Sequence, residues 1–141
     1  MPEATTRARR ELPVLGAIAA GGALGALARY GVAQTWPARP GGFPWATFGI
    51  NVSGCLAIGV LLVVITELRA THRLARPFLG TGILGGFTTF STYAVETGRL
   101  LRDHPVTALV YLAGTATAAL IAVQAGVVAT RTLALHGRET R

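Results

Sequence analysis

The sequence predicts an all-α membrane protein with four transmembrane helices. Of its 141 residues, 51% are hydrophobic and only 13% are charged, which excludes a disordered chain or an ordinary soluble domain. The apolar residues fall into four runs, each long enough to cross a bilayer. All thirteen basic residues are arginines, placed almost wholly outside these runs, so the net charge of +7 indicates the membrane surface and not nucleic acid. We expect one membrane domain over residues 1–141.

The first predicted span covers residues 12–34. Small residues give it a face suited to close helix packing, namely Gly21, Gly22, Gly25 and Ala26. Arg29 lies near its far end, where a charge in lipid is costly. We expect this arginine to reach the interface or to pair inside the protein.

The second predicted span, residues 45–66, follows a turn rich in proline, glycine and tryptophan at residues 36–45. It contains Asn51, the only carboxamide within the two middle spans, and Thr47 lies four residues earlier on the same helical face. A buried asparagine can tie helices together by hydrogen bonds or can line a polar site. The second span alone leaves both interpretations open.

The third predicted span, residues 78–98, is expected to be broken near 85–89. Its segment GTGILGGFTTFSTY, residues 80–93, contains four glycines and then five hydroxyl residues. Glycines loosen a helix and hydroxyls compete for its backbone bonds, and freed carbonyls cannot face hydrocarbon. Packing through Gly82 and Gly86 would explain the glycines alone. The sequence TTFST favours a broken span that forms an ion or solute site.

The fourth predicted span, residues 106–130, follows a tight turn at 99–105. It places Tyr111 and Thr115 one turn apart. A four-residue spacing of small residues predicts close packing of this helix, at Gly114, Ala118, Ala122 and Gly126.

The arginines also predict the orientation. Nine lie on the side of the two termini and the 67–76 loop, and three lie on the opposite side (Arg39, Arg99 and Arg102). Positive charge is retained in the cytoplasm, so we expect a multi-pass plasma-membrane protein with both termini cytoplasmic.

The spans lack the groups of an enzyme. The histidines lie at positions 72, 104 and 136, in loops or the tail, and no span holds an acid pair, a Ser-His-Asp set or a metal-ligand spacing. What remains is a set of neutral hydrogen-bond donors, including Asn51 and Tyr111, which can stabilise a partly dehydrated anion and still release it. The rings of Phe90 and Tyr93 can add positively polarised edges, or can be ordinary core.

Three motifs resemble the fluoride channel family (Fluc, also called CrcB). They are GALARY at residues 25–30, GINVSG at 49–54 and GGFTTFSTY at 85–93, and the likeness covers nearly the whole chain. The resemblance implies a passive fluoride channel that exports fluoride from the cytoplasm and gives fluoride resistance. It also implies a dimer of two oppositely oriented subunits with two pores and a structural sodium ion (Na+) at the dimer centre.

Carried onto this sequence, the resemblance assigns the functional residues. Asn51 would be the pore asparagine, and Phe90 and Tyr93 the aromatic box. Backbone carbonyls of Gly85 and Thr88 would hold the sodium ion. The remaining assignments are a hydroxyl track of Ser91, Thr92, Tyr111 and Thr115, with Thr47 as a weaker candidate, and a structural or vestibule role for Arg29 and Glu96.

Three positions depart from the family pattern. Tyr93 stands where phenylalanine is usual, Ala94 where serine is frequent, and Ala119 where another hydroxyl is expected. Some relatives in this family work as two dissimilar subunits. The departures and the arginine bias suggest the hypothesis of an obligate pair with an oppositely oriented homologue. The alternative is a homodimer, which needs a chain that inserts in both orientations.

Two other functions fit parts of the sequence. A proton-coupled antiporter like the small multidrug resistance family needs an acid within the membrane, but the first span has none and Glu96 lies near a span end. A non-transporting assembly subunit would explain the glycines but not Asn51 together with TTFST. Selectivity for fluoride over chloride is implied only by the resemblance, because neutral donors alone do not choose a halide.

Overall fold

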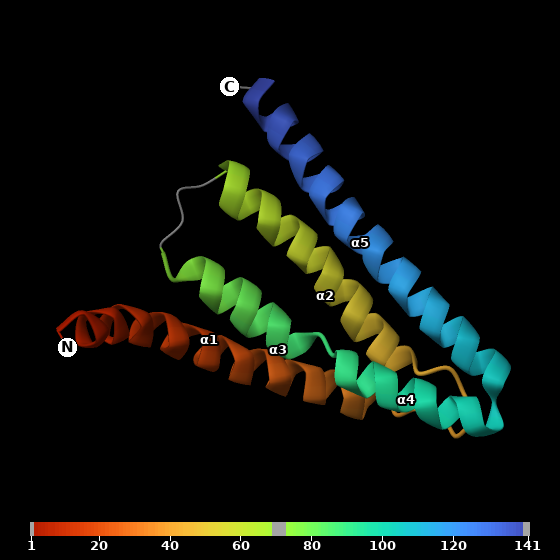
Figure 1. The fold of residues 1–141 in the computed structure, drawn as a ribbon. Coiled ribbons are helices and arrows are strands. Elements are labelled where there is room, and N and C mark those ends of the chain that lie inside the picture. The colour runs from red at the N-terminus through yellow and green to blue at the C-terminus, as the bar shows by residue number, and fades with distance from the viewer. Residues whose placement is uncertain (1, 69–72, 140–141) are drawn as a thin grey trace.

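The computed structural model describes residues 2–68 and 73–139, and these are almost entirely helical (Figure 1). Three helical stretches have the length and composition to cross a membrane, at Glu11–Thr35, Trp45–Glu67 and Pro105–His136. The predicted all-helical membrane protein is therefore confirmed. In chain order the elements are α1 (Pro2–Thr35), α2 (Trp45–Val63), η1 (Val64–Leu68), η2 (Pro77–Leu84), α3 (Gly85–Phe87), α4 (Phe90–Asp103) and α5 (Pro105–Glu139).

The third apolar segment is two helices and not one. The π-helical η2 runs directly into α3, which ends at Phe87, and α4 begins at Phe90. Between them Thr88 and Thr89 are extended, with ψ angles of 154° and 117°. The Thr89 hydroxyl accepts a hydrogen bond from the Thr92 N–H at 3.2 Å and so caps the start of α4. The interruption falls within residues 85–89.

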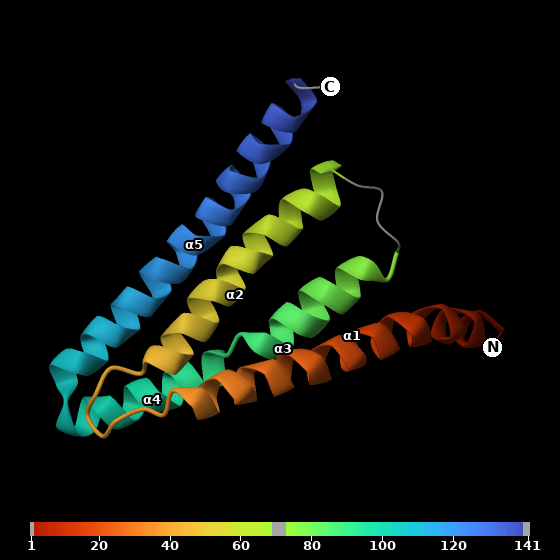
Figure 2. The same cartoon turned by 180° about the vertical axis from the view of Figure 1, so that it is seen from behind.

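The interruption lets one segment pack against two different helices. η2 and α3 lie along α1, whereas α4 packs against α5, and α2 pairs with α5. The molecule thus has two diverging arms, one of α1 with η2 and α3 and the other of α2 with α5 (Figures 1 and 2). α4 connects the arms at the end where they meet.

Glycines set the closest helix contacts. A Cβ atom on Gly25 would overlap the carbonyl oxygen of Ile83, and one on Gly86 would overlap the backbone of Gly22. The Gly82–Gly86 spacing therefore serves packing against α1, and the helix break follows it in the chain. In the other arm, Gly126 meets the backbone of α2, but a Cβ on Gly114 would meet open space. The predicted small-residue stripe of α5 therefore packs only over its later part.

The loop at residues 36–44 and the α4–α5 turn lie at one end of the molecule (Figure 1). The ring of Phe43 packs edge-on against Tyr111, with centroids 5.2 Å apart. Gly41 has a positive φ of 70° and sits against the ring of His104. The predicted turn at 99–105 is wrong in extent: α4 continues to Asp103, and Pro105 begins α5, because proline is well suited to a first helical position.

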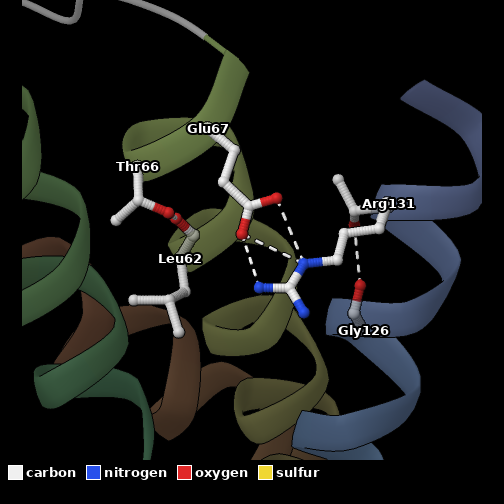
Figure 3. A network of polar contacts seen from close by, with 6 residues as sticks. Leu62, Thr66, Glu67, Gly126 and Arg131 are labelled. Atoms are coloured by element: carbon white, nitrogen blue, oxygen red, sulfur yellow. Dashed lines mark hydrogen bonds and ion pairs between the residues drawn. The ribbon is translucent and has the colours of Figure 1, made fainter. Parts of the chain in front are cut away.

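At the opposite end an ion pair joins η1 to α5. The Nε of Arg131 lies 3.0 and 3.1 Å from the two carboxylate oxygens of Glu67 (Figure 3). Both side chains are substantially exposed, so the pair contributes little stability. The rest of the predicted polar loop lies partly outside the described residues.

Candidate ion-conduction site

Asn51 of α2 bonds to the backbone at the helix interruption. Its Nδ2 donates to the Thr89 carbonyl at 3.0 Å, and its Oδ1 accepts from the Thr89 N–H at 2.8 Å. Thr89 is buried, and buried backbone groups need partners. Asn51 therefore replaces the partner that the interruption takes from the Thr89 N–H and also bonds to the Thr89 carbonyl, which is the helix-tying role that the sequence left open.

The interruption also changes the partners of two carbonyls in α3. Because the Thr89 N–H donates to Asn51, it does not bond to the Gly85 carbonyl four residues earlier. The Gly86 carbonyl instead accepts from the Nε of Arg29 at 3.1 Å. Arg29 is thus paired inside the protein, at the edge of the break.

A groove of about 260 Å³ lies beside the interruption, between α2, α4 and α5. Thr115 is only 3% exposed, and its hydroxyl oxygen has no hydrogen-bond partner among the described residues. A buried unpaired hydroxyl is costly, so the Thr115 oxygen needs a partner that the described residues do not supply. The lining residues are Asn51, Cys55, Thr88, Thr89, Phe90, Tyr93, Thr115, Ala116 and Ala119.

The two predicted aromatic residues differ in exposure. Phe90 is 79% exposed and Tyr93 is 8% exposed, with ring centroids 5.9 Å apart. The hydroxyl of Tyr93 donates to the Leu112 carbonyl of α5. The phenol oxygen that distinguishes Tyr93 from phenylalanine is therefore bonded to the protein backbone.

A second polar cluster surrounds Glu96. One carboxylate oxygen accepts from the Thr47 hydroxyl at 3.0 Å, and the other accepts from the Tyr111 hydroxyl at 2.7 Å. Tyr111 is fully buried. Glu96 thus joins α2, α4 and α5 at the end where the arms meet, and in this arrangement Tyr111 donates to Glu96 and does not line the groove.

The first turn of α4 holds the other predicted hydroxyls. Ser91 is exposed, and the Thr92 hydroxyl lies 2.9 Å from that of Thr89. Neither residue lines the groove, which brings together the predicted Asn51, Phe90, Tyr93 and Thr115. Sequence reasoning did not select Thr89, although a hydroxyl residue directly before a helix is a recognisable capping signal.

Residues 16–127 match the sequence model of the family described as "CrcB-like protein, Camphor Resistance (CrcB)". The chain is similar to "Fluoride-specific ion channel FluC 1" of Streptomyces coelicolor, with 58% identity over 116 residues (82% of this chain, 75% of that protein). It is also 58% identical to "Fluoride-specific ion channel FluC 2" of Streptomyces avermitilis over 106 residues (74% of this chain, 67% of that protein). The chain is likewise 58% identical to "Fluoride-specific ion channel FluC 2" of Nocardia farcinica over 119 residues (84% of this chain, 85% of that protein).

Proposed function

This chain belongs to the CrcB-like family, and we propose that it is a fluoride-specific ion channel of the plasma membrane. Passive export of fluoride from the cytoplasm would give the cell fluoride resistance. The family relationship, the names of the similar proteins and the membrane-spanning helices support this function. Within the structure, the observation that carries it is Thr115, which lines the groove together with Asn51 and whose buried hydroxyl has no partner among the described residues.

Neutral donors explain how such a groove would pass an anion. Fluoride that leaves bulk water needs replacement hydrogen bonds, and the Thr115 hydroxyl supplies one. The Asn51 amide nitrogen has a second N–H beyond the one given to Thr89, and the Phe90 ring offers its positive edge. None of these donors carries a full charge, so the anion is stabilised and can still leave.

The groove also favours passive conduction over proton-coupled exchange. Proton coupling in the membrane uses an ionisable acid or histidine that faces the transport route. Among the residues that line this groove there is no Asp, Glu, His, Lys or Arg. The Glu96 carboxylate lies in the separate cluster with Thr47 and Tyr111.

We further propose that η2, α3 and α4 together make a membrane crossing, the third of four in chain order, and that a second subunit covers their interruption. Gly85 is exposed on the single chain, and its carbonyl has lost the usual helical donor. Such a group cannot face hydrocarbon. A partner in the opposite orientation, as the family resemblance implies, would bring its own interruption to the same place.

The same interruption suits a structural Na+ ion between the subunits. The carbonyls of Gly85 and Thr88 are hard oxygen ligands, and neither accepts a backbone hydrogen bond from across the break. One chain offers too few oxygens for a cation, whereas two chains would offer two carbonyls each. Among the described residues no cluster of three His, Cys, Asp or Glu side chains could hold a metal ion instead.

The partner is proposed to be an oppositely oriented homologue. Nine arginines lie on the side of the termini and three on the other, which favours insertion with both termini in the cytoplasm. The test is to express this chain alone and to map the accessibility of its termini from each membrane face. A dimer with termini on both faces would show a self-sufficient homodimer and contradict the obligate pair.

Growth on fluoride tests the function in cells. A bacterium without its own fluoride exporter, expressing this chain with or without an oppositely oriented homologue, should grow at fluoride concentrations that stop the empty-vector control. Resistance to toxic organic cations without resistance to fluoride would overturn the proposal in favour of drug export.

A further inference from the structure

Cys55, the only cysteine in the chain, lies in the candidate ion groove. It follows Asn51 by one turn of α2, is half-buried, and lines the same groove as Asn51 and Thr115. Its place in the groove gives its thiol access to whatever occupies that space.

Two successive turns of each helix line the groove. α2 and α5 run in the same direction side by side (Figures 1 and 2). α2 contributes Asn51 and, one turn later, Cys55, and α5 contributes Thr115 and, one turn later, Ala119. The later of these two turns of α5 provides no polar side chain to the groove.

We propose that Cys55 is a pore-lining residue whose thiol supplies, from α2, the donor that Ala119 lacks on α5. This inference rests on the proposed channel function and adds a residue to the route. The independent observation is Thr115 of α5, which lines the same groove and whose buried hydroxyl has no hydrogen-bond partner among the described residues. A thiol is a weak donor that costs little when unpaired, so it can contact a passing anion without trapping it.

A pore-lining thiol also makes the channel sensitive to soft metal ions. Silver ion binds thiolate sulfur strongly: Ag+ displaces the thiol proton, an S–Ag bond forms and H+ is released. A silver ion held on Cys55 would narrow the groove beside this residue. Because the chain has one cysteine, loss of this sensitivity in a variant would identify the residue.

Fluoride efflux from liposomes in chloride-free buffer tests the proposal, with a cysteine-free homologue added if a partner is required. Micromolar Ag+ should slow wild-type efflux by about tenfold or more and leave Cys55→Ser and Cys55→Ala unaffected. Without silver, Cys55→Ala should conduct about three- to tenfold more slowly than Cys55→Ser, the range for one weak hydrogen bond.

A thiol outside the groove provides the matched control. Leu120 adjoins Ala119 on α5 and is 71% exposed, so the double variant Cys55→Ala/Leu120→Cys carries a thiol at similar depth and should resist silver. If silver leaves wild-type fluoride efflux unchanged, or slows efflux by the control variant equally, the proposed role of Cys55 is wrong while the channel function stands. Absence of fluoride flux from wild type, alone and with the partner, would overturn both.

Discussion

Replacing Asn51 by alanine removes the side chain that joins α2 to the helix interruption. Two hydrogen bonds are lost, of 2.8 and 3.0 Å, both to the backbone of Thr89. Side-chain hydrogen bonds in membrane proteins average about 0.6 kcal/mol each and reach about 1.7 kcal/mol. The pair therefore contributes about 1–3 kcal/mol to the free energy of unfolding. The upper part of this range is favoured because Thr89 is buried, so its backbone groups are shielded from water when the Asn51 amide is removed.

Asn51→Asp distinguishes two roles of Asn51: bonding to the backbone at the helix interruption, and donating a hydrogen bond to the anion. Asn51→Asp keeps an oxygen that can accept from the Thr89 N–H, but it loses the amide donor and places a negative charge beside the groove. We expect Asn51→Asp to lose about half as much stability as Asn51→Ala. Its fluoride flux should nevertheless be lost completely, because like charges repel in a low-dielectric site.

Detergent-based unfolding and liposome efflux measure the two effects. Gln124→Ala is the matched control, since it removes an exposed carboxamide of α5 outside the groove and should change neither stability nor flux. The reasoning is refuted if Asn51→Ala unfolds like wild type within about 0.5 kcal/mol, or if the aspartate variant conducts fluoride normally.

Three further predictions follow from the helix contacts. Tyr93→Phe should keep fluoride flux within about twofold and lose about 0.6–1.7 kcal/mol of stability. The reason is that only the hydrogen bond to the α5 backbone disappears. A large loss of flux in efflux assays would place the hydroxyl in the pore. Gly25→Ala should lower the free energy of unfolding by about 1–3 kcal/mol, because its Cβ would overlap η2. The control Gly31→Ala should be tolerated, because a Cβ there meets open space. Equal effects of the two variants would contradict this packing. Arg29→Gln should destabilise the chain by about 0.5–2 kcal/mol in the same assay through weaker bonding to the Gly86 carbonyl, and an unchanged stability would show that this carbonyl finds another donor.

The membrane class and much of the helix order were predictable from the sequence. Long apolar runs identify membrane helices because lipid excludes unpaired polar groups, and glycines next to hydroxyl residues indicate a weakened helix. The place of the interruption was not specified to the residue. It lies at Thr88 and Thr89, because Gly82 and Gly86 remain helical against α1 and the Thr89 hydroxyl starts a new helix.

The candidate site was predictable where a polar residue stands out in an apolar span. Asn51 was selected for this reason and lies at the interruption. The Glu96 cluster was not foreseen, because its partners come from helices that are distant in sequence. Cys55 gave no polar signal, and only the pairing of α2 with α5 places it in the groove.

Fluoride efflux from liposomes tests the central claim most directly. The chain, alone and with an oppositely oriented homologue, is reconstituted in vesicles loaded with potassium fluoride or potassium chloride, and valinomycin carries the potassium. The account predicts rapid fluoride efflux from at least one preparation while chloride is retained. Chloride efflux as fast as that of fluoride, or no fluoride efflux from either preparation, would contradict it.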